Sequence, residues 1–166
     1  MLCCKPMRTA LFCVLVAGWA GGSSAEETLF QYDTDSSGYW HEGVNWDQGV
    51  SPGSADDVVV IDRPLADPTI TYSGTSGTSL VKSLASEESI VLSGGTLDVL
   101  TSAQLNANFT LAGGTLKGGT ITSVPGIDVS MSGNNSADGI TLFGDLQLTS
   151  SGDYLKVLNG LTLNGT

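Results

Sequence analysis

A short phrase recurs in this chain at an interval that strongly restricts its fold. Ser93-Gly94-Gly95-Thr96-Leu97 returns 19 residues later as Ala112-Gly113-Gly114-Thr115-Leu116. Each copy follows a short apolar alternation, Ile90-Val91-Leu92 before the first and Phe109-Thr110-Leu111 before the second. A repeat of about 20 residues built from short strands and glycine turns is typical of β-solenoids. The repeat therefore predicts stacked coils that share one core.

Looser echoes of this pattern continue toward the C-terminus. They occur at Val129-Ser130-Met131-Ser132-Gly133, Leu146-Gln147-Leu148-Thr149-Ser150 and Leu161-Thr162-Leu163-Asn164-Gly165. Apolar residues alternate in them with small polar residues, and this period of two predicts strands whose apolar side chains point inward. No stretch shows a 3.6-residue period long enough to predict a helix.

The fold that follows is all-β: a right-handed β-solenoid, or parallel β-helix, over residues 63–166 in coils of roughly 20 residues. A β-sandwich of hairpins is the structural alternative. The last echo reaches the final residues without a polar cap. We therefore expect either an incomplete solenoid or one whose free edge associates end to end with another copy.

The segment 26–62 differs from the coils, and we expect it to form an aromatic N-terminal cap and a first strand. It holds both tryptophans that follow residue 25, Trp40 and Trp46. A solenoid end exposes a strand edge and apolar core, and two large rings could close it. The runs Val58-Val59-Val60-Ile61 and Thr69-Ile70-Thr71-Tyr72 predict two successive strands.

Residues 1–25 have the features of a signal peptide. Lys5 and Arg8 precede an apolar run at 10–17 that is too short to span a bilayer, and Ala25 ends a small-residue segment suited to cleavage. The same segment contains all three cysteines of the chain, Cys3, Cys4 and Cys13. The mature chain therefore lacks a disulfide framework and a thiolate zinc site. We expect an exported protein, located at the cell surface, in the periplasm or outside the cell.

The charge of the mature chain restricts its partners. All 17 acidic residues follow residue 25, whereas two of the 6 basic residues precede it, so the net charge after cleavage is 4 − 17 = −13. Such a surface repels nucleic acid and anionic lipid. We expect no nucleic-acid partner and no membrane insertion of the mature chain. Polysaccharide or other surface proteins are the partners that remain.

One stretch carries a family resemblance. Gly38-Tyr39-Trp40 is followed by Asn45-Trp46-Asp47-Gln48-Gly49-Val50-Ser51-Pro52 and then by Asp57-Val58-Val59-Val60-Ile61. Together with the Gly-Gly-Thr-Leu coils, this phrase resembles the opening of exported bacterial β-helix surface proteins of the planctomycete type. It is also similar to the repeats of autotransporter passenger regions. The resemblance implies a structural or interaction protein, such as a stalk, an adhesin-like segment or an envelope component, and it carries over no catalytic residue.

The segment 33–38 resembles the start of a calcium loop. Asp33, Asp35 and Ser37 supply oxygens at positions 1, 3 and 5, and glycine stands at position 6. Position 12 is Val44 rather than an acid, and no helix flanks the segment. An ordinary turn is therefore the competing hypothesis. These three residues are the metal candidate, calcium is the only candidate cofactor, and the turn needs neither.

Two functional alternatives compete with a structural role. Trp40 and Trp46 could stack on the sugar rings of a polysaccharide, a hypothesis that requires exposed rings. A carbohydrate-active enzyme would need several carboxylates gathered on one face of adjacent coils, where Lys82, Lys117 and Lys156 could add a basic line. The acids of the coils are widely spaced, and the single histidine has no partner pattern. We therefore predict a noncatalytic protein without catalytic residues.

Overall fold

Stacked strands make up most of the regular structure. The computed structural model describes residues 26–165, so the predicted signal peptide lies outside the described residues. Two 3-10 turns occur, η1 (Gly43–Asn45) and η2 (Gly74–Ser76). The strands are β1 (Thr28–Gln31), β2 (Gly38–Tyr39), β3 (Asp57–Ile61), β4 (Thr69–Tyr72), β5 (Thr78–Ser86), β6 (Ser89–Leu92), β7 (Thr96–Leu105), β8 (Phe109–Leu111), β9 (Thr115–Lys117), β10 (Thr120–Ser123), β11 (Val129–Met131), β12 (Asn134–Phe143), β13 (Leu146–Leu148) and β14 (Tyr154–Asn164).

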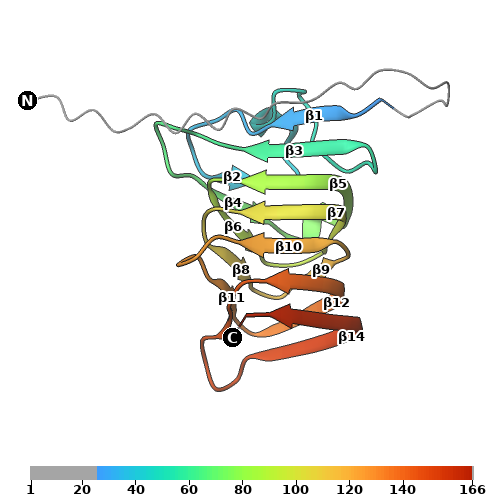
Figure 1. Cartoon of the computed structure of the whole chain (residues 1–166). Helices are drawn as coiled ribbons and strands as arrows, with labels where there is room; N and C mark the ends of the chain where they lie inside the picture. The colour runs from blue at the N-terminus through green and yellow to red at the C-terminus, as the bar shows by residue number, and fades with distance from the viewer. Residues whose placement is uncertain (1–25, 166) are drawn as a thin grey trace, which may run out of the picture.

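The strands form two sheets that run along the molecule. The larger sheet has the order β1-β3-β5-β7-β10-β12-β14, with β9 between β7 and β12, and the smaller has the order β2-β4-β6-β8-β11-β13. Figure 1 shows the larger sheet as a ladder from β1 to β14. We call the β1 end the head and the β14 end the tail. All pairings within the sheets are parallel, which confirms the predicted parallel β-solenoid and contradicts the sandwich of antiparallel hairpins.

The register confirms the coil length. Ile90 pairs with Phe109, 19 residues further along the chain, and Phe109 pairs with Val129 after another 20 residues. The two glycine phrases also lie in register, because Leu97 is opposite Leu116. The spacing in the sequence is therefore the length of chain that leads once around the solenoid.

Four strands, β5, β7, β12 and β14, are long because they continue from one face of the coil to the next. The β5–β7 pairing shifts register between Val81 and Ser83, and the β12–β14 pairing shifts between Asp138 and Ile140. In the coil between β7 and β12, two separate strands replace the long one: β9 and β10. A full coil therefore has three strand segments, two in the larger sheet and one in the smaller.

The core consists of apolar columns along the solenoid axis. In the smaller sheet one column passes through Ile70, Ile90, Phe109 and Val129, which are all buried, and ends at the partly buried Leu146. Each coil shares its inner face with the coils on either side, so no coil buries its apolar side chains alone. The core is therefore continuous through the described residues.

The predicted strands are found, with one correction to the repeat. The strands expected at 58–61 and 69–72 are β3 and β4. The last echo, however, does not continue the column of the others. Leu146 pairs with Val129 in the smaller sheet, whereas Leu161 pairs with Ile140 in the larger one. All faces share the same alternation of apolar and polar residues, so the pattern alone does not tell them apart.

Glycine is required in the repeated phrase because neighbouring coils approach closely at this corner. Gly95 has a φ of +71°, and a Cβ atom there would lie 2.5 Å from the carbonyl oxygen of Gly77. At Gly114, a Cβ atom would lie 2.6 Å from Cγ of Leu92. A larger residue would meet the preceding coil at either position, which explains why the phrase retains both glycines.

Candidate functional site

A cluster of aromatic rings closes the head of the solenoid. Trp40 is 0% exposed and Trp46 is 3% exposed. The centroid of the Trp46 ring lies 5.0 Å from that of Trp40 and 5.4 Å from that of Tyr32, both in edge-to-face geometry. The Trp40 ring also lies 5.6 Å from the Tyr72 ring of β4. The cluster therefore extends the apolar core beyond the first coils and ends it.

Both indole N–H groups are satisfied inside this cluster. Nε1 of Trp40 donates to the carbonyl oxygen of Pro52 at 3.1 Å, and Nε1 of Trp46 donates to the carbonyl oxygen of Trp40 at 2.8 Å. A sugar ring stacks only on an aromatic face that is open to solvent. Neither ring offers such a face, so the geometry supports the cap and not the carbohydrate-binding role.

The loop after η1 covers the free edge of β1. The N–H of Gln31 donates to Oδ1 of Asp47 at 2.9 Å, and the N–H of Asp47 donates to the carbonyl oxygen of Gln31 at 3.0 Å. Nε2 of Gln48 donates to the carbonyl oxygen of Leu29 at 3.1 Å. The outer hydrogen-bonding groups of the edge strand therefore have partners, which blocks the addition of another strand.

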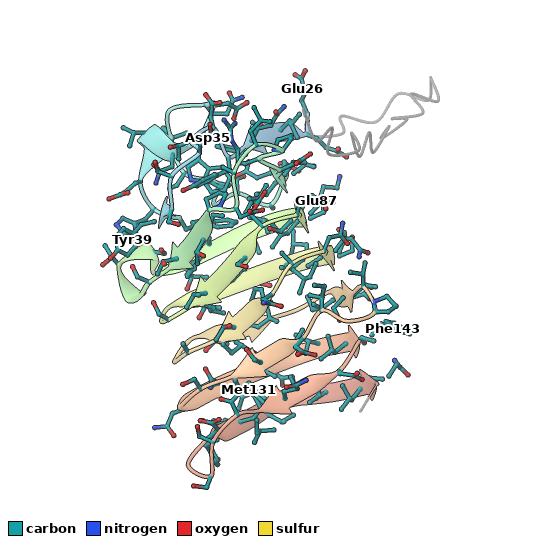
Figure 2. The ribbon with its side chains drawn as sticks, turned by 90° about the vertical axis from the view of Figure 1, so that its left-hand side faces the viewer. Glu26, Asp35, Tyr39, Glu87, Met131 and Phe143 are labelled. Carbon is teal, nitrogen blue, oxygen red and sulfur yellow. The ribbon has the colours of Figure 1, made fainter. Side chains whose placement is uncertain are left out.

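The three residues of the calcium candidate contact the second coil. Nη2 of Arg63 lies 2.7 Å from Oδ1 of Asp35, and Nη1 lies 3.4 Å from Oδ1 of Asp33. Oγ of Ser37 accepts the N–H of Thr69 at 2.8 Å. Figure 2 shows Asp35 at the head. The guanidinium supplies the positive charge that a cation would supply to the two carboxylates, so the segment is held without a metal. The calcium site itself stays a prediction.

Arg63 joins more segments than its place in a Pro- and Asp-rich loop indicates. Besides its two ion pairs, Nη1 donates to the carbonyl oxygen of Tyr32 at 3.3 Å. Its main-chain N–H donates to Oε1 of Glu88 at 3.1 Å. The hydrogen bond to Asp35 is the main reason that the pKa of Arg63 is raised further above its usual value. A lone arginine between turn residues carries no sequence signal for this role.

Glu88 is a second residue that the sequence did not single out. It lies at the corner between β5 and β6, where Oγ of Ser86 donates to its carbonyl oxygen at 2.7 Å. Desolvation is the main cause that raises the pKa of the Glu88 carboxyl; the negative charge of Asp67 adds to this, and the hydrogen bond from Arg63 opposes it. In the sequence, Glu87 and Glu88 form an ordinary acidic pair. Only the register shows that Glu88 is the buried member.

The three lysines considered as a basic line occupy three different places. Lys117 lies in register with Asp98, and its Nζ is 2.6 Å from Oδ2 of that carboxylate. Lys156 lies in register with Ser136, in another column. Lys82 lies within the register shift of β5. The lysines therefore do not line one face together.

The tail differs from the head because its inner face is open. Six apolar side chains of the last coil lie in register with buried residues of the coil before. We call this set the tail face: Leu146, Leu148, Leu155, Val157, Leu161 and Leu163. Leu148 is 57% exposed, Val157 48% and Leu163 40%. Leu146, Leu155 and Leu161 line an apolar hollow that reaches Leu116 of the earlier coil.

Broader comparisons add no assignment. Within residues 26–165, no group of three or more His, Cys, Asp or Glu side chains is placed to hold a metal ion. Over this same part of the chain, no helix combines the length and apolar character that crossing a membrane requires. No family model matches the chain, and neither does any curated protein or solved structure. The resemblance to exported β-helix surface proteins therefore stays a prediction.

Proposed function

We propose that the mature chain is a noncatalytic structural or interaction element of the cell surface or envelope, such as a stalk or an adhesin-like segment. The observation that carries this proposal is the use of the candidate functional side chains. Trp40 and Trp46 close the core, and Asp33 and Asp35 hold Arg63. Residues that could have formed a binding site instead hold the solenoid together.

The shape and charge of the molecule are consistent with this role. The larger sheet places seven successive strands along one axis. A strand spacing of about 4.8 Å gives a rod about 29 Å long. Its acidic surface favours solubility and disfavours sideways association with identical rods. Such a rod can act as a spacer or present a surface to a partner without any chemistry of its own.

Export is tested with the full chain in a bacterial host. We expect the exported protein to begin at Glu26, as read by N-terminal sequencing, and to be accessible to added protease on intact cells or in the periplasm. A Val14→Arg variant interrupts the apolar run of the predicted signal and should remain uncleaved in the cytoplasm. Cytoplasmic retention of the wild-type chain with residues 1–25 intact would contradict the proposal.

The noncatalytic role is tested with residues 26–166 on a polysaccharide and glycan panel, with and without calcium. We expect no specific binding, no chain cleavage and tryptophan emission that does not respond to glycan or calcium. Specific binding that shifts the emission would support the polysaccharide-binding module instead. Release of reducing ends or of unsaturated products would support the carbohydrate-active enzyme.

A further inference from the structure

We propose that the tail face binds the tail face of a second copy, so that two solenoids join tail to tail about a two-fold axis. In this arrangement β14 of one copy lies antiparallel to β14 of the other. The inference goes beyond the proposed function and does not depend on it, because it concerns an association surface and not what the assembled rod does.

The main chain of β14 is available for such a pairing. The N–H of Tyr154 donates to the carbonyl oxygen of Gly133, and the carbonyl oxygen of Asn164 accepts the N–H of Gly144. Both residues therefore direct their main-chain groups toward the neighbouring coil. Alternate residues of a strand direct theirs to opposite sides, so Leu155 and Leu163 face the outer edge. Among the described residues, β14 is the last strand of its sheet.

The side chains that meet at this edge are apolar. Leu155 and Leu163 lie in register with the buried Asn135 and Leu142, so their side chains point into the solenoid. The inner face and the unpaired main chain thus belong to the same alternate residues of β14. A strand that pairs with this edge also covers the open end of the core. Self-pairing therefore satisfies the backbone and covers apolar surface in one step.

The head does not offer a matching surface. Its core is closed by Trp40 and Trp46, and its edge strand is already bonded to Asp47 and Gln48. Head-to-tail stacking would set an open apolar face against a sealed end, without a new ladder. The tail is therefore the better partner for another tail, and the contact closes after two copies because both tail faces are then covered.

The distribution of charge favours the same arrangement. Residues 26–62, which contain the head, carry nine acidic residues and no Lys or Arg. Residues 146–165, which contain the tail face, carry one acid, Asp153, and one base, Lys156. Two tails therefore meet without net charge, whereas two heads would bring eighteen carboxylates together. Tail-to-tail association also places the two acidic heads as far apart as possible.

Light scattering coupled to size exclusion tests the association with residues 26–166 over a wide concentration range. We expect a discrete species of twice the mass of one chain, and no larger one. The Val157→Lys/Leu163→Lys double variant should be monomeric, because it sets four like charges into the contact. Val50→Lys is the matched control: Val50 is 59% exposed in the loop near the head. This variant should remain dimeric. Far-UV circular dichroism of both variants reports whether the solenoid is intact.

Geometry is tested with single cysteine variants, since residues 26–166 contain no cysteine. Copies labelled at Thr162→Cys with donor and acceptor dyes should show strong energy transfer on mixing. Copies labelled at Thr28→Cys, at the heads, should show the weakest transfer. A monomeric wild type, open-ended polymers, a dimer insensitive to the tail substitutions, or strong transfer between head-labelled and tail-labelled copies would each overturn the proposal.

Discussion

Replacing Trp40 with alanine is the sharpest test of the cap. The ring is fully buried between Trp46 and Tyr72, so its removal leaves a cavity at the end of the core. Substitutions of this kind cost about 3–5 kcal/mol. Domains of this size are stable by about 5–15 kcal/mol in total. We therefore expect Trp40→Ala to remove a large share of the free energy of unfolding.

Two further variants divide this cost into its physical parts. Trp40→Phe keeps an aromatic ring but removes the donor to the Pro52 carbonyl. Leaving that buried acceptor unsatisfied costs about 1–3 kcal/mol. Leu65→Ala truncates a side chain that is 96% exposed and should change stability by less than about 0.5 kcal/mol. The expected order of stability is therefore Leu65→Ala, then Trp40→Phe, then Trp40→Ala.

The assay is equilibrium urea unfolding of residues 26–166 followed by far-UV circular dichroism, which does not depend on tryptophan emission. A change in midpoint at constant slope reports a change in stability. If Trp40→Ala lost no more than Leu65→Ala, the ring would not be a structural cap, and an exposed sugar platform would regain support. A lower slope would indicate that the head opens separately from the remaining coils.

Three other substitutions follow from the contacts of the solenoid. The folded pKa of Glu88 lies above its unfolded value, so its contribution is complete below the unfolded pKa and is lost as pH rises through the folded pKa. Glu88→Gln should therefore gain unfolding free energy relative to wild type between about pH 4 and about pH 7 in urea titrations. Gly95→Ala should cost about 2 kcal/mol or more, because it combines a positive φ with a clash, and Gly53→Ala should be near neutral in the same assay because its Cβ has open space. Arg63→Gln should cost about 1 kcal/mol by thermal unfolding at low salt, and less at high salt; a cost that salt does not change would contradict the ion-pair explanation.

The spacing of the repeat predicted the coil, because a solenoid of fixed cross-section uses nearly the same chain length for each turn. Leu97 and Leu116 are therefore neighbours in space. The strand at 69–72 was predictable for a local reason: it is a β-branched and aromatic run that begins directly after Pro68 and ends before Gly74. Local pattern and global repeat agree in these coils.

The faces of the coil and the contacts at the head were not predictable in the same way. Leu161 repeats the pattern of Leu146 but belongs to another face, because the bend near Asp138 shifts the register of the long strands. The ion pairs of Arg63 and the burial of Glu88 depend on which loops meet across coils. Such meetings depend on distances around the turn, which a short motif does not contain.

The sealed head and the open tail also give the chain a direction of folding. Synthesis produces the head first, and its aromatic cluster is complete once Tyr72 has joined Trp40 and Trp46. Each later coil contacts mainly its neighbours, so it can form on the edge that the previous coil presents. The head thus serves as a template, and the molecule grows one coil at a time in the order of translation. Unfolding should proceed in the reverse order, with amide exchange fastest in the last coil and slowest near the cap.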